Sequence, residues 1–190
     1  MKKNRWIIVL AAVCIMTVLV MFVLPLFSAP GYSIIRNTLS ELGAQSAPRA
    51  WIMNYYFIAL AIGSVVAGWR NFEGFIFHRI VLVIFGLSLL SMALFNHAPV
   101  NPDIHFSLTE DGWHAYFACT AGLSFILLSL ASGLILDKQQ DRLLAIGAGL
   151  SMLLLSILMS EAEWAAGVWQ RLMFMIAFGW MIYNFRARES

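Results

Sequence analysis

The chain has 190 residues, of which 61% are hydrophobic and 12% are charged, whereas a soluble domain carries about 25% charged residues. This composition excludes a soluble globular protein, because most of the chain cannot face water. The formal net charge of +2 is small and the basic residues form no cluster, so nucleic acid is excluded as a partner. Cys14 and Cys119 lie in apolar runs at expected depths that differ by roughly 9 Å of helix rise, and we expect two free thiols.

Six apolar segments follow one another along the chain, each close to the roughly 20 residues that a helix needs to cross a bilayer. The first follows Lys2, Lys3 and Arg5, and its apolar core is too long for a cleaved signal peptide, so we expect an uncleaved anchor. The sequence therefore predicts one all-α integral membrane domain over residues 1–190. It would be an antiparallel bundle of six transmembrane helices at about 6–27, 50–69, 77–96, 113–136, 142–160 and 164–185.

The distribution of lysine and arginine predicts the orientation in the membrane. With the amino terminus in the cytoplasm, nine basic residues lie on the cytoplasmic side and three on the other side. Both termini are then cytoplasmic, at the inner membrane, and the two long connections at 28–49 and 97–112 are extracytoplasmic. The nine are Lys2, Lys3, Arg5, Arg70, Arg79, Lys138, Arg142, Arg186 and Arg188, and the three are Arg36, Arg49 and Arg171.

The first long connection carries signals for helix starts and stops. Thr38-Leu-Ser-Glu41 fits a capping box and Gly43 fits a helix stop, which together predict a short helix. Ser46 and Pro48 are expected to start the second span, as its cap and first-turn proline.

Arg171 lies about seven residues into the last span, roughly 10 Å below the extracytoplasmic boundary. An arginine near the middle of a span costs about 2.5–3.5 kcal/mol, and less where it snorkels, so a compensating partner is expected. Glu163 and Gly167 precede it on nearly the same helix face, and Glu41 or Asp111 could reach it from another element. A structural ion pair, contact with an anion or a lipid headgroup, and simple snorkelling all stay open.

Asp111 and His114 follow a second capping box, at residues 107–110, and lie three residues apart on one face of the fourth span. A carboxylate beside an imidazole could orient that ring for proton transfer. Acidic residues also favour helix amino termini for electrostatic reasons alone, so a structural role is equally open.

A metal site could draw on His97, His105 and His114 together with Asp103 or Asp111, a set that would suit zinc. The spacings between these histidines match no short ligand motif, and neither HxxxH nor HExxH occurs. No metal or other cofactor is therefore favoured, and His97, His114 and Asp111 are the weak candidates.

Several stretches of the chain together resemble a known family. They are Ser40 to Gly43 followed by Trp51 to Asn54, His97 to Pro102, Asp111 to His114, and Gly167 to Arg171. Over nearly its whole length the chain resembles the bacterial and archaeal domain-of-unknown-function family 998. The resemblance implies a six-helix membrane domain, similar to the Frag1/DRAM type of six-span proteins. It supplies no established activity, so it assigns no catalytic residue.

These observations favour a non-enzymatic protein with an extracytoplasmic polar pocket. The pocket would bind a lipid headgroup or a small amphiphile, or would anchor another membrane protein, so membrane lipids are the expected partners. One alternative is an intramembrane metal-dependent hydrolase whose His97, His114 and Asp111 hold a metal that activates water. A second alternative is a small transporter, although Arg171 is the one charge expected within a span. The expected members of the pocket are Glu41, Asp111, His114 and Arg171, with Glu163 and His97 as further candidates.

Overall fold

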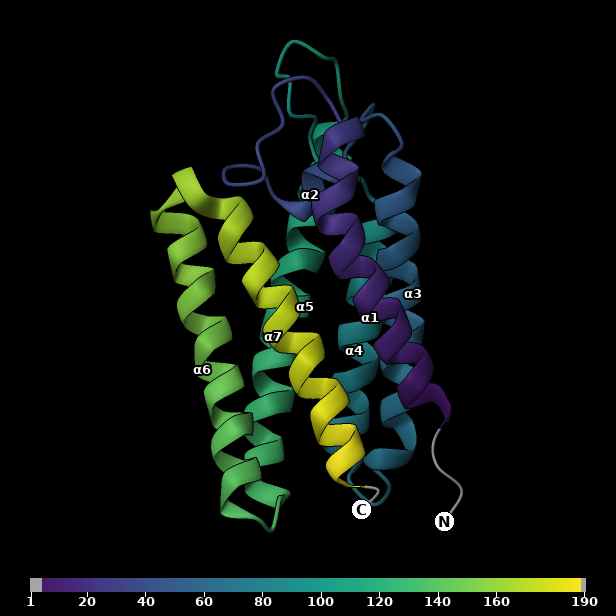
Figure 1. The fold of residues 1–190 in the computed structure, drawn as a ribbon, viewed down its shortest axis with the longest axis vertical. Coiled ribbons are helices and arrows are strands. Elements are labelled where there is room, and N and C mark those ends of the chain that lie inside the picture. The colour runs from purple at the N-terminus through teal and green to yellow at the C-terminus, as the bar shows by residue number, and fades with distance from the viewer. Residues whose placement is uncertain (1–4, 189–190) are drawn as a thin grey trace.

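The computed structural model describes residues 5–188, which form seven α-helices, two short 3-10 helices and, within that range, no β-strand (Figure 1). Six of the helices are long and apolar enough to cross a membrane. The elements are α1 (Arg5–Val23), η1 (Leu24–Phe27), α2 (Leu39–Leu42), α3 (Ala50–Asn71), α4 (Ile76–Leu94), α5 (Leu108–Ile135), α6 (Gln139–Glu161), η2 (Glu163–Ala165) and α7 (Ala166–Ala187).

The long helices fall where the apolar segments predicted six spans. The largest difference is at α5, which begins at Leu108, five residues before the expected span. It begins where the capping signal at residues 107–110 predicts a helix start, because Ser107 accepts a hydrogen bond from the backbone of Glu110. The short helix α2 also has the predicted capping box, formed by Thr38 and Glu41. Lys2 and Lys3, on which the predicted orientation partly depends, lie outside the described residues.

The predicted start of the second span is wrong in its details. Ser46 does not cap α3, and the residue before the helix is Arg49, whose side chain makes no capping hydrogen bond. Ser46 and Arg49 both adopt positive φ angles, of 61° and 58°. These two residues, one on each side of Pro48, turn the chain into the helix. The start of α3 is therefore set by the backbone conformation and not by a side-chain cap.

Apolar side chains cover the outside of the bundle as well as its interior. Leu26, Leu108 and Leu134 are 76%, 75% and 83% exposed. Exposing these side chains to water would cost free energy, whereas contact with lipid would not. Hydroxyl groups within the helices bond back to the carbonyl one turn earlier, as Ser64 does to Leu60 at 2.6 Å. A helix that satisfies its polar groups internally can lie in hydrocarbon, so the fold is that of an integral membrane protein.

The six long helices pack in a ring that follows the order of the chain, and α7 closes the ring against α1 and α3. Both ends of the described chain lie at one end of this ring, which we call the terminal end (Figure 1). The segments 28–49 and 95–107 lie at the opposite end, which we call the loop end (Figure 1). The largest apolar core lies inside the ring and includes the fully buried Phe125, Leu128 and Phe185.

An aromatic cluster at the terminal end encloses a histidine. The ring of His78, on the first turn of α4, stacks on Phe72 at 5.0 Å between centroids and also contacts Phe75 and Phe77. His78 is 5% exposed, and within residues 5–188 neither ring nitrogen has a hydrogen-bond partner, although the backbone of Ala131 lies near the ring. A buried polar atom without a partner lowers stability by about 1–3 kcal/mol.

Replacing His78 with phenylalanine is therefore expected to stabilise the protein by about 1 kcal/mol, because the aromatic contacts remain and the unpaired nitrogens are removed. The measurement is the temperature at which half of the detergent-purified protein loses its monodisperse peak on heating. A fall in that temperature would mean that the imidazole has a polar partner in the native protein.

Candidate functional site

The guanidinium of Arg171, in the second turn of α7, is enclosed by backbone carbonyl groups. Its Nη1 donates to the carbonyl oxygens of Ile34 at 2.8 Å, Asn37 at 3.0 Å and Gly167 at 2.8 Å. Its Nε and Nη2 both donate to the carbonyl of Met21 at 3.4 Å. Arg171 is 2% exposed, so these dipoles replace the water that its charge has lost.

A tyrosine completes the surroundings of the guanidinium. Nη2 of Arg171 donates to the hydroxyl of Tyr32 at 2.8 Å, and that hydroxyl donates to the carbonyl of Thr38 at 2.8 Å. Burial raises the pKa of Tyr32 to about 12, against the opposing effect of Arg171. The phenol therefore keeps its proton at physiological pH and can donate and accept at the same time.

Two neighbours of Arg171 fasten α7 to the first long connection. The side-chain oxygen of Gln170 accepts a hydrogen bond from the backbone of Leu39 at 2.5 Å, and its nitrogen donates to the hydroxyl of Ser40 at 3.4 Å. Gly167 lies against the carbonyls of Ile34 and Asn37, where a Cβ atom would collide with both oxygens. The approach that lets those carbonyls reach the guanidinium thus requires glycine at this position.

No acidic residue within residues 5–188 forms an ion pair with Arg171, in contrast to one of the expectations from the sequence. Glu41 instead accepts hydrogen bonds from the side chain of Asn37 at 2.6 Å and from the backbone and hydroxyl of Thr38. It reaches the guanidinium only indirectly, through Asn37, whose carbonyl binds Arg171, and through Thr38, whose carbonyl binds Tyr32. Glu163 is exposed on η2 and lies outside this cluster.

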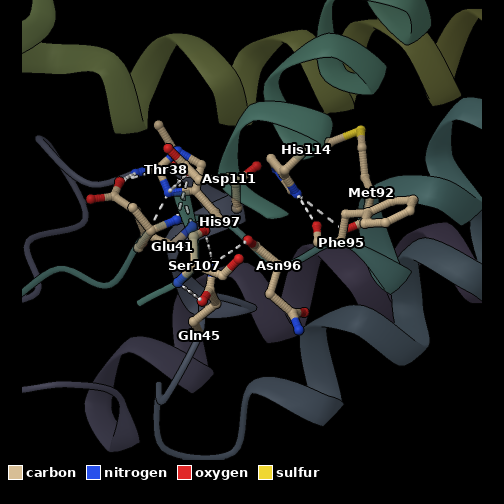
Figure 2. Close-up of polar contacts among 12 residues, drawn as sticks. Thr38, Glu41, Gln45, Met92, Phe95, Asn96, His97, Ser107, Asp111 and His114 are labelled. Atoms are coloured by element: carbon tan, nitrogen blue, oxygen red, sulfur yellow. Dashed lines mark hydrogen bonds and ion pairs between the residues drawn. The ribbon is translucent and has the colours of Figure 1, made fainter. Parts of the chain in front are cut away.

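His114 holds the end of α4. Its Nδ1 lies 3.1 Å from the carbonyl oxygen of Met92 and 2.8 Å from that of Phe95 (Figure 2). Carbonyl groups only accept hydrogen bonds, so Nδ1 carries the proton in the neutral ring and Nε2 carries a lone pair. His114 is 2% exposed, and its Nε2 has no partner among the described residues. The imidazole from α5 thus binds carbonyls at the end of a neighbouring helix.

Asp111 and His97 lie next to His114. The carboxylate of Asp111 accepts a hydrogen bond from the backbone of Ala98 at 2.7 Å and lies 3.8 Å from Nδ1 of His97. The rings of His97 and His114 meet edge to face with their centroids 5.3 Å apart. The structure therefore brings together the three residues weakly favoured as metal ligands, but within 5–188 it places no three His, Cys, Asp or Glu side chains in an arrangement that could hold a metal ion. His105 and Asp103 are exposed and lie in the loop before α5.

Two amide side chains join the long connections to each other. Gln45 donates to the carbonyls of Asn96 and Ser107, both at 3.0 Å, and accepts from the backbone of Ser107 at 2.7 Å (Figure 2). Asn54, on the second turn of α3, donates to the carbonyl of Gly43 and to the side chain of Asn96. We call residues 28–49 and 95–107, joined in this way, the polar cap.

A cavity of about 460 Å³ lies among α4, α5, α6 and α7, in the half of the ring nearer the loop end. The rings of Phe85, Phe125 and Phe178 form its floor. The centroid of the Phe85 ring lies 6.3 Å from that of Phe125 and 6.1 Å from that of Phe178. Gln170 lies at its loop end, so the residue that fastens α2 also lines the cavity. By helix rise the distance from Gln170 to Phe178 is about 12 Å, close to the thickness of half a bilayer core.

The cavity is the part of the site that the sequence does not indicate. Its lining is apolar apart from Cys119, Ser156, Ser160 and Gln170, and among the described residues that line it there is no charged side chain. Charged and imidazole groups stand out in an apolar sequence, whereas an apolar cavity wall cannot be told from an apolar core by composition. Gln170 is not marked by any sequence motif, although it stands beside Arg171 in one of the stretches that carry the family resemblance.

The fold and the site together define a multi-spanning helical membrane protein with a polar cap over an apolar cavity. Residues 9–185 match the family described as protein of unknown function DUF998, and the chain belongs to that family. The resemblance noted in the sequence is thereby confirmed. No curated protein and no solved structure matches the chain.

Replacing Gly167 with alanine is expected to destabilise the protein by about 1–3 kcal/mol, because the added methyl group displaces the carbonyls that bind Arg171. Thermal unfolding in detergent measures the effect. Gly179→Ala is the matched control on the same helix, since a Cβ there meets nothing within 4 Å, and alanine should there stabilise the helix slightly. Equal behaviour of the two variants would contradict the packing described for Gly167.

His114→Phe is expected to destabilise the protein by about 1–3 kcal/mol, because the carbonyls of Met92 and Phe95 lose their donor. Replacing histidine with phenylalanine is thus expected to stabilise the protein at position 78 and to destabilise it at position 114. His114→Gln, which keeps a side-chain N–H donor, should recover part of the loss in the same unfolding assay. A neutral effect of His114→Phe would show that these carbonyls find another donor.

Proposed function

We propose that the protein binds a membrane amphiphile whose apolar part occupies the cavity among α4, α5, α6 and α7. The observation that carries the proposal is the cavity itself, with a volume of about 460 Å³ and a lining without charged side chains among the described residues. Ligand sites in proteins have volumes of about 300–1,000 Å³ and are mostly apolar, with a few polar groups that fix orientation. Ser160 supplies such a group toward the loop end.

The proposed setting is the inner membrane, with an antiparallel six-helix bundle and both termini in the cytoplasm. The excess of lysine and arginine in the connections of the terminal end supports this orientation. The polar cap is then extracytoplasmic, and the cavity lies at the depth of the outer leaflet. Membrane lipids are the proposed partners, and attachment of another membrane protein to the polar cap stays a separate prediction from the sequence.

The arrangement of polar groups favours the apolar cavity over a headgroup site at Arg171. Each nitrogen of that guanidinium already donates to an oxygen of the protein, so a phosphate could bind only by displacing the connection at 32–37. Asp111 carries a negative charge, which disfavours an anionic headgroup beside it, and one of its oxygens already accepts a hydrogen bond from the backbone of Ala98. We therefore assign Arg171, Glu41, Asp111 and His114 to the support of the polar cap, and the binding of ligand to the cavity beneath it.

The proposal is tested by filling the cavity at Gly122 of α5. A Cβ at this position meets nothing within 4 Å, so Gly122→Leu should fold normally and occupy the space of the ligand. Wild-type protein purified in a mild detergent should carry close to one equivalent of amphiphile, extracted and quantified by mass spectrometry. The variant should carry much less, with an unchanged unfolding temperature in the delipidated state.

Gly147→Leu is the matched control. Gly147 lies on α6 and also has open space around it, but it does not line the cavity. This variant should retain the amphiphile as the wild type does. Equal retention by Gly122→Leu would overturn the proposal, because a leucine and a ligand cannot occupy the same volume.

A further inference from the structure

We infer that the cavity takes the chain of a single-chain amphiphile, which enters sideways between α5 and α6 from the leaflet at the loop end. The inference rests on the proposed function and specifies both the ligand class and the route. Three features of the described structure lead to it: the spacing of α5 and α6, the obstruction at the loop end, and the volume of the cavity.

The two helices pack closely only in the half toward the terminal end. There Gly149 of α6 lies against Ser129 and Leu130 of α5, so closely that a Cβ at Gly149 would come within 2.7–3.0 Å of their side-chain atoms. Gly133 of α5 faces Ile146 in the same way. Small residues of this kind let helix backbones approach each other in a membrane. Toward the loop end α5 and α6 separate (Figure 1).

The lining of the cavity reaches the surface between these separated halves. Leu123 of α5 lines the cavity and is nevertheless 61% exposed. Cys119, one turn earlier, and Ser160 of α6 are also exposed lining residues. Gly122 leaves space beside them, because its Cβ would meet no atom within 4 Å. We call the opening bounded by Cys119, Leu123 and Ser160 the portal.

The route from the loop end is obstructed. Gln170 lines the cavity and holds the backbone of Leu39, and Leu39 and Leu42 of α2 are fully buried. A ligand arriving from that side would have to break these contacts and move the polar cap. At the other end, the rings of Phe85, Phe125 and Phe178 close the floor. The portal faces hydrocarbon and so admits the apolar part of a lipid without exposing it to water.

The volume indicates one chain. A cavity of about 150 Å³ lined by apolar side chains holds one benzene molecule. The cavity here, about 460 Å³, is roughly three times larger and so has space for on the order of 18 carbon atoms. That is the size of one lipid chain and not of two. Because no charged side chain lines the cavity in the described chain, the polar head is expected to stay at the portal, beside the hydroxyl of Ser160.

Cys119 provides a reporter within the portal. The only other cysteine is Cys14, so a Cys14→Ser variant carries one thiol, and that thiol is exposed at the portal. The variant, in nanodiscs, is treated with a lipid-soluble maleimide, with and without added monopalmitoylglycerol. When monopalmitoylglycerol is present at ten times its Kd, the rate at which the maleimide alkylates Cys119 should fall about tenfold, because only protein with an empty cavity reacts. Added dipalmitoylphosphatidylcholine should not protect the thiol.

Ser160→Trp, which narrows the portal, should slow the exchange of a fluorescent single-chain probe, and the readout of this variant is the exchange rate and not the amount of probe retained. Ile157→Trp is the control, since Ile157 is exposed on the same helix but does not line the cavity. The entry route fails separately from the proposed function. That outcome is loss of retention in Gly122→Leu, together with no protection of Cys119 and wild-type exchange in Ser160→Trp. The ligand would then occupy the cavity but enter it elsewhere. Equal protection by the two-chain lipid would overturn the single-chain assignment. If Gly122→Leu has no effect on retention, the proposed function itself fails.

Discussion

The loop end depends on a cation that is neutralised by backbone dipoles and not by a carboxylate. The guanidinium of Arg171 is almost completely removed from solvent, and it binds carbonyls from α1, from the connection after α1 and from its own helix. Such an arrangement is stable only while every carbonyl keeps its place, because a buried charge that loses its partners costs several kcal/mol. The connection at 32–37 is thereby confined to one conformation, and Gly167 is confined to glycine by the same contact.

This constraint explains how a bundle can retain a cavity. Near the loop end the helices are held by their ends: α7 through Arg171 and Gln170, α4 and α5 through His114, and α3 through Asn54. Because the polar cap fixes the ends of α4, α5 and α7, side chains need not fill the space that these three helices share with α6. In the other half, close contacts such as those at Gly149 hold the helices together directly, and the ring is packed.

The sequence was sufficient for the architecture and for part of the site. The six spans could be predicted because hydrocarbon admits only long apolar helices, and α2 because the capping box at Thr38 and Glu41 is a local signal. Arg171 stood out because a charge within a span is costly. Its partners could not be predicted, since backbone carbonyls belong to every residue and leave no trace in the sequence. The cavity could not be predicted because Phe85 or Gly122 would look the same in a filled core.

The stretches that carry the family resemblance all meet at the polar cap. Ser40, Asn54, Asp111, His114 and Gln170 come from these stretches, and each makes a hydrogen bond that fixes a connection or a helix end there. Polar residues gathered at one end of a membrane bundle suggest catalysis, yet each of these side chains bonds to the protein itself, although Nε2 of His114 has no partner among the described residues. What they share is the support of α2 and the ends of α4 and α7 around an apolar space. The chemistry of the site is therefore better sought in what that space contains than in the polar groups above it.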